Sequence, residues 1–150
     1  MTRKLERILI AIDDSPSASA AIEQGLAIAG DEGAQVIFAH VVSIAGEHFV
    51  PGDDKPDRVP EKARTELLIE AESKAAAAGI ECATELLIGY PPKQIALLAD
   101  ELDVDLVVIG SRHLTGIKRF LLGSTSRALL GETVRPILVV PEPVLEPALT

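Results

Sequence analysis

Three uniformly aliphatic segments constrain the fold of this chain more than any other feature of its sequence. They are Ile8–Ile12, Leu106–Ile109 and Ile137–Val140, and none of them contains a polar residue. A strand without polar alternation has to bury both of its faces, which happens mainly in parallel sheets covered by helices on both sides. The sequence therefore predicts an α/β fold built on a mainly parallel sheet.

Helix-forming segments fill the intervals between the predicted strands. Ser15 and Pro16 are typical of a helix start, and Gly30 and Gly79 are typical of helix ends. Strand and helix alternate about five times, which favours parallel strands joined by right-handed crossovers. The further strands expected are residues 35–42 and 81–88, and the expected helices are residues 16–30, 61–78, 91–101 and 124–130.

The two outer strands of this sheet are also predictable. Residues 81–88 alternate between apolar and polar side chains, as a half-exposed edge strand does. If the sheet is doubly wound with its switch between the first and fourth strands, the last strand lies at the other edge. An uncovered apolar edge invites pairing with another chain. We therefore expect a second copy of the chain to cover Ile137–Val140 in a homodimer.

The chain length of 150 residues predicts one domain, residues 1–141, followed by a C-terminal tail at residues 142–150. Between the second strand and the second helix, residues 43–60 hold three prolines and two glycines. We expect a loop there that is long for a compact domain and mobile.

Composition excludes several classes of partner. The net charge is −9 and aromatic residues make up 3% of the chain, so neither the basic surface nor the stacking rings of a nucleic-acid-binding protein are expected. Cys82 is the single cysteine, so no internal disulfide forms and a reducing cytoplasm fits best. The apolar run at the N-terminus is too short for a signal core or a membrane span, and no membrane partner is expected.

Residues 110–126 carry the most chemical information. Gly123 precedes a predicted helix whose free N–H groups and hydroxyl side chains would form an anion site. Gly110 leaves the preceding strand with freedom to adopt a positive φ. The segment is neither a Walker A loop nor a Gly-x-Gly-x-x-Gly motif, so an ordinary surface loop with a serine N-cap is the alternative. A local basic cluster in the same segment favours a phosphate chain, and its members are Arg112, Lys118 and Arg119.

Asp13 follows the first strand, and in open α/β sheets ligands bind beyond the carboxyl ends of the strands where the strand order reverses. Its carboxylate would accept hydrogen bonds from a ribose or an amine at that place. The alternative is a local Asx-type turn or a helix cap. His40 lies within an apolar strand, where a core or pocket-wall role is favoured over that of a catalytic base.

The spacing of these residues resembles a known signature. Gly110 is followed by two residues, position 113, nine residues and then Gly123-Ser124, which is similar to the Gly-x2-Gly-x9-Gly-Ser/Thr pattern of the universal stress protein family. The likeness extends from Arg7 to Val140. It implies a Rossmann-like, doubly wound sheet of five strands with helices on both faces, and a homodimer formed through the last strand. In the nucleotide-binding branch it also implies ATP, AMP or another adenine nucleotide, with any Mg²⁺ held mainly by the phosphates.

The resemblance also implies roles for single residues. Asp13 would hold the ribose or the base, Val41 would meet adenine between aliphatic side chains, and Gly110 would approach the phosphates. The phosphate oxygens would be met by the residues that open the following helix, Gly123, Ser124 and Thr125, with Ser126 nearby. The full candidate set comprises Ala11, Ile12, Asp13, Val41, Ile109, Gly110, Ser111, Arg112, His113, Gly123, Ser124, Thr125 and Ser126.

One residue departs from the family pattern, because His113 stands where the signature has its second glycine. A side chain there would crowd the ligand if the position needs a positive φ or close backbone contact. An imidazole could instead donate a hydrogen bond to a phosphate. We expect a small cytoplasmic stress-response protein that binds the nucleotide for signalling or protection and has no catalytic role. The alternatives are a dimeric interaction module that has lost nucleotide binding and a very weak ATPase.

Overall fold

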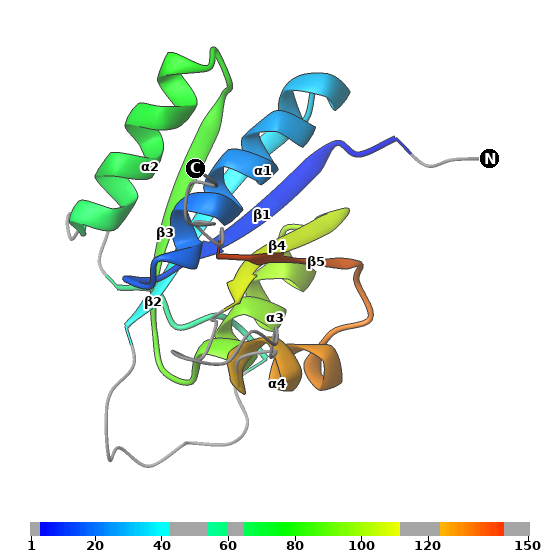
Figure 1. The fold of residues 1–150 in the computed structure, drawn as a ribbon. Coiled ribbons are helices and arrows are strands. Elements are labelled where there is room, and N and C mark those ends of the chain that lie inside the picture. The colour runs from blue at the N-terminus through cyan, green and yellow to red at the C-terminus, as the bar shows by residue number, and fades with distance from the viewer. Residues whose placement is uncertain (1–3, 43–53, 60–64, 112–123, 143–150) are drawn as a thin grey trace, which may run out of the picture.

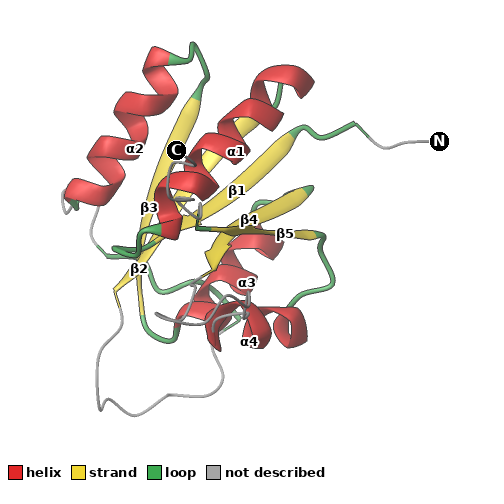
Figure 2. Ribbon diagram, viewed as in Figure 1, coloured by secondary structure: helices red, strands yellow, loops and turns green. Residues whose placement is uncertain are grey.

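The computed structural model describes residues 4–42, 54–59, 65–111 and 124–142. Strands and helices alternate along these residues (Figures 1 and 2). None of the helices in these ranges combines the length and the apolar character that a bilayer crossing requires. The strands are β1 (Arg7–Ile12), β2 (Gln35–Val42), β3 (Cys82–Ile88), β4 (Leu106–Ser111) and β5 (Ile137–Pro141), and the helices are α1 (Ser17–Glu32), α2 (Glu66–Ala77), α3 (Pro91–Glu101) and α4 (Ser124–Glu132).

The strands form one sheet in the order β3-β2-β1-β4-β5, and every neighbouring pair is parallel. β1 and β4 are neighbours at the centre, with Ile10 of β1 opposite Val108 of β4. Helices α1 and α2 cover one face of the sheet, and α3 and α4 cover the other (Figure 1). This arrangement confirms the predicted α/β class and its doubly wound, five-stranded parallel sheet with helices on both faces.

β1 is buried on both faces of the sheet, as its aliphatic sequence predicts. Ile8 and Ile10 belong to the apolar cluster that includes α1 and α2. Leu9 and Ala11, which point the other way, belong to the cluster that includes α3. Because successive residues enter different clusters, the strand contributes to both halves of the core.

The first helix differs from its prediction at both ends. The N-cap of α1 is Pro16, and the Ser15 side chain makes no capping hydrogen bond within the described residues. At its other end the helix continues through Gly30 to Glu32. It ends there because Gly33 adopts a left-handed φ of 69°, which glycine tolerates without a steric cost.

The second helix begins later than residue 61, where its helix-forming composition placed the start. Thr65 has an extended backbone, and its Oγ1 accepts a hydrogen bond of 3.4 Å from the backbone N–H of Leu68. This side-chain cap makes Glu66 the first helical residue. Residues 61–64 of the predicted helix lie outside the described residues. β4 and α4 are also longer than predicted and end at Ser111 and Glu132.

The edge strands are β3 and β5, as predicted. Part of the predicted mobile loop lies along β3, where Arg58 forms an isolated antiparallel bridge with Leu87. Residues 57–59 are therefore anchored at this edge, while residues 43–53 and 60 lie outside the described residues, as does most of the predicted tail at 143–150.

Gly110 lies in β4 where the first turn of α1 packs on the sheet. A β-carbon at this position would lie 2.7 Å from the carbonyl oxygen of Ser17 and 2.6 Å from its Oγ, which is too close for any side chain. The backbone of Gly110 is not left-handed, because the positive-φ glycines of the described ranges are Gly33, Gly79 and Gly89. The predicted freedom to adopt a positive φ is therefore wrong for Gly110, and the close approach of α1 to β4 explains the glycine.

The substitution Gly110→Ala is expected to lower the free energy of unfolding by about 1–3 kcal/mol, the usual cost of overpacking, because the Ser17 backbone cannot move aside as a flexible side chain would. Gly131→Ala is the matched control, since nothing lies within 4 Å of a β-carbon there. Urea unfolding followed by circular dichroism measures both variants. Equal loss of stability in the two variants would contradict the explanation of Gly110.

Candidate functional site

A crevice opens at the carboxyl ends of β1 and β4, where the strand order reverses. The helices that follow these two strands, α1 and α4, lie on opposite faces of the sheet, and such a divergence leaves a gap that ligands of α/β proteins occupy. Its empty volume is about 480 Å³, including space open to solvent. The residues that line it are Ala11, Ile12, Asp13, Ala18, Ala39, Val41, Pro91, Ile95, Ile109, Gly110 and Thr125.

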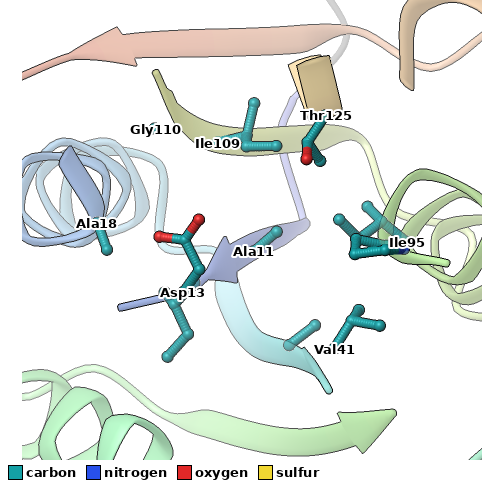
Figure 3. A pocket seen from close by; sticks show the side chains of 11 residues that line it. Ala11, Asp13, Ala18, Val41, Ile95, Ile109, Gly110 and Thr125 are labelled. Atoms are coloured by element: carbon teal, nitrogen blue, oxygen red, sulfur yellow. The ribbon is translucent and has the colours of Figure 1, made fainter. Parts of the chain in front are cut away.

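The walls of the crevice are mainly aliphatic (Figure 3). Ala11 and Ile109 come from the central strands, Val41 from β2, and Ile95 from α3. No Phe, Tyr or Trp is among the residues that line it in the described part of the chain. A flat apolar group would therefore be held by aliphatic contact rather than by stacking on a ring.

Two polar side chains enter this apolar crevice, Asp13 from the end of β1 and Thr125 from the first turn of α4. In Figure 3 the carboxylate of Asp13 and the hydroxyl of Thr125 both point toward the space between the labelled side chains. Asp13 is exposed, so its charge remains solvated. The crevice thus offers an acceptor on one side and the start of a helix, with its free N–H groups, on the other.

Asp13 also makes a local turn. Its Oδ1 accepts a hydrogen bond of 2.9 Å from the backbone N–H of Ser15 and a second one from the Ser15 hydroxyl. That hydroxyl lies 3.0 Å from the Oγ of Ser17. The Asx-type turn was the alternative to a binding role, and the structure contains it. The turn does not remove the carboxylate from the crevice but fixes the direction in which it points.

The structure brings seven of the predicted site residues together as crevice lining: Ala11, Ile12, Asp13, Val41, Ile109, Gly110 and Thr125. Ser111 and Ser126 are buried at the end of β4 and in the first turn of α4. The Oγ of Ser111 is the buried side-chain oxygen that lacks a hydrogen-bond partner in the described structure. Ser124 begins α4, and Arg112, His113 and Gly123 lie outside the described residues.

Four lining residues escaped the sequence analysis, namely Ala18, Ala39, Pro91 and Ile95. Ala39 lies two residues before Val41 on the same strand and therefore on the same face, a periodicity that could have found it. Pro91 and Ile95 are four residues apart on α3 and share one helix face. The position of α3 beside the crevice results from tertiary packing. The sequence of Pro91 and Ile95 does not indicate which part of the fold they face.

His40 lies on the opposite face of the sheet from the crevice lining of β2. Its Nδ1 is 3.0 Å from the Oγ1 of Thr65, the residue that caps α2. Burial lowers the pKa of His40 below its usual value, while the charges of Asp13 and Asp14 partly oppose this shift. The half-buried ring thus links β2 to the start of α2, which agrees with the predicted core role.

The described residues contain no group of three or more His, Cys, Asp or Glu side chains that could hold a metal ion. Together, the strand order and the crevice at the switch point define a Rossmann-like α/β domain. Comparison with known proteins narrows this class. Residues 4–141 match the model of the Universal stress protein family, and the chain belongs to this family.

One similar sequence supports the same family, and two solved structures share the fold. The chain is 30% identical over 147 residues to the universal stress protein YxiE of Bacillus subtilis, covering 89% of this chain and 97% of that protein. A universal stress protein solved in complex with cAMP matches with a TM-score of 0.67 and 24% identity, covering 94% of this chain and all of the other. A family member from Arabidopsis thaliana with AMP bound matches with a TM-score of 0.68 and 18% identity, covering 95% and 97%.

Acid is expected to destabilise the protein through His40. Because the folded state lowers the pKa of His40, the unfolded state binds more protons as the pH falls below the ordinary histidine pKa of 6.5. The neutral His40 ring thus contributes to the free energy of unfolding above pH 6.5. This contribution is lost as the pH falls toward the pKa of His40 in the folded state. In His40→Asn, whose amide can still meet Thr65, the free energy of unfolding should decrease less between pH 7 and pH 5. Urea unfolding across this range measures both proteins, and equal pH dependence would contradict the role of His40.

Proposed function

We propose that the crevice binds an adenine nucleotide, ATP or AMP, and that the chain belongs to the nucleotide-binding branch of its family. In this proposal it is a cytoplasmic stress-response protein whose nucleotide state alters its binding to partners, and it has no catalytic role. The observation that carries the proposal is the crevice itself, an apolar slot with Asp13 on one side and the first turn of α4 on the other.

The parts of a nucleotide correspond to the parts of the crevice. The base would lie between Val41, Ile95 and Ile109, because these aliphatic side chains face the same space. The ribose hydroxyls would donate hydrogen bonds to the carboxylate of Asp13. The phosphates would lie at the N-terminus of α4, where N–H groups without helical partners and the hydroxyl of Thr125 suit an anion.

Two further observations support the proposal. The family members with cAMP and with AMP bound have the same fold as this chain, with TM-scores of 0.67 and 0.68. In the sequence, three basic residues follow β4 before α4 begins, and these concentrate positive charge in an otherwise acidic chain: Arg112, Lys118 and Arg119. In our proposal His113, which replaces a signature glycine, donates a hydrogen bond to a phosphate rather than blocking it.

Binding rather than turnover is proposed because of the acidic groups at the crevice. Phosphoryl transfer needs a carboxylate that holds a metal ion and a second group that positions the nucleophile. Asp13 is the one acidic side chain among the residues that line the crevice in the described structure. Any Mg²⁺ would then be held mainly by the phosphates and water.

Calorimetric titration tests the proposal, together with quantification of the nucleotide released by heat from freshly purified protein. Wild-type protein should bind ATP or AMP, and Ala11→Ile should weaken binding tenfold or more, about 1.4 kcal/mol, because it fills the centre of the crevice. Ala83→Ile is the matched control, since it makes the same change at an exposed residue of β3, away from the crevice. A wild type without released nucleotide and without heat of binding would overturn the proposal in favour of an interaction module that has lost the nucleotide.

We further propose that the chain forms a homodimer through Ile137–Val140 of β5. This edge strand is aliphatic, and Ile137, Leu138 and Val139 are only partly buried in the single chain. Sedimentation at micromolar concentration should give the mass of a dimer. Leu138→Lys should give a monomer, because lysine on an edge strand opposes pairing. Its melting temperature should fall, because Leu138 also packs against the apolar cluster that includes α1. A monomer mass for the wild type would contradict this assembly.

A further inference from the structure

Residues 57–59, here called the strap, join β3 to α3 from outside the sheet. The strap runs antiparallel to the end of β3. The backbone N–H of Val59 donates to the carbonyl of Leu86, and that of Ile88 donates to the carbonyl of Asp57, each at 3.0 Å. These two bonds flank the bridge between Arg58 and Leu87. The strap therefore pairs with the edge of the sheet through one isolated antiparallel bridge.

The strap is also bonded to α3 beside the crevice. The backbone N–H of Asp57 donates to Oε1 of Gln94 at 2.7 Å, and Nε2 of Gln94 donates to Oδ2 of Asp57 at 3.3 Å. Gln94 is buried, so its amide depends on these partners. Its side chain also packs beside the turn at Gly89, where an added β-carbon would lie 3.3 Å from Nε2.

Arg58 of the strap also bonds to the other end of α3. The guanidinium of Arg58 donates to both carboxylate oxygens of Glu101, and its Nε donates to Glu85 of β3 at 2.9 Å. These hydrogen bonds raise the pKa of Arg58, and the pKa of Glu101 is lowered by its bond with Arg58. Gln94 and Glu101 are separated by about two helical turns. The strap therefore holds α3 at two points along its length.

The helix that the strap holds is a wall of the crevice. Pro91 and Ile95 of α3 line it, and Gln94 is the residue before Ile95. We propose that the strap is a positioning element for the ligand site: by holding Gln94 and Glu101, it sets the distance of the α3 wall from β1 and β2. Docking of the strap and binding of the ligand are then coupled, and each strengthens the other by the same factor. This inference rests on the proposed binding of an adenine nucleotide.

Calorimetry with AMP separates this role from simple coverage of an edge strand. Arg58→Ala and Gln94→Leu should weaken AMP binding roughly fivefold or more, the usual lower range of coupling between sites. Lys74→Ala is the matched control. Lys74 forms an ion pair with Glu70 within α2, on the other face of the sheet, and this pair involves neither α3 nor the strap. It should leave the affinity within about twofold, because losing an exposed ion pair affects stability alone and only slightly.

Hydrogen exchange measured by NMR tests the coupling separately. If the strap only stabilised the fold, AMP would not change the exchange rates of its amides. The amides of Val59 and Ile88 are bonded only while the strap is docked, so saturating AMP should slow their exchange in wild-type protein. Gln94 is buried, whereas Arg58 is exposed. If Gln94→Leu does not fold, Arg58→Ala keeps the test valid. Unchanged AMP affinity in Arg58→Ala, with unchanged exchange in the wild type, would overturn the strap role alone. No AMP binding by the wild type would overturn both this inference and the proposed function.

Discussion

The burial of β1 and β4 side by side at the centre of the sheet is the constraint on which the rest of the structure depends. Leu9 and Ile10 of β1, and Val107 and Val108 of β4, are fully buried in pairs that face opposite sides of the sheet. Because neither strand has room for a polar side chain along its buried length, polar groups enter only where the strands end. The helices that follow diverge to opposite faces there, and the crevice lies between them. The burial that stabilises the fold thus also determines where a ligand can bind.

The parts of the fold that the sequence predicts are those with a local signal. Uniform aliphatic runs identified the central strands, alternation identified β3 as an edge, and Asp13 followed from its place after β1. The strap had no such signal, because Arg58 bonds to side chains 27 and 43 residues away along the chain. The start of α2 was misplaced because the residues before Thr65 have a helix-forming composition, and one side-chain cap outweighs that preference.

Gly110 illustrates how a signature residue can have two explanations. In the resemblance to the family it would approach the phosphates, and it does line the crevice. In the fold it is needed in any case, because the carbonyl of Ser17 leaves no space for a β-carbon. The presence of Gly110 therefore does not distinguish a chain that binds nucleotide from one that has lost binding. Asp13 and Thr125 distinguish these cases better, since their polar atoms point into the crevice.

The walls of the crevice differ in how they are held. Ala11, Ala39 and Ile109 belong to strands that have a hydrogen-bonded neighbour on each side, so a shift of any of them breaks two ladders. Ile95 belongs to α3, which is held by apolar packing, by the strap and by the ion pairs of Lys93 and Asp100, with no strand ladder to break, so it can slide at a lower cost. The shape of the crevice is thus most easily changed through α3. If the proposed coupling holds, a partner that displaced the strap from β3 would alter ligand affinity without contacting the ligand.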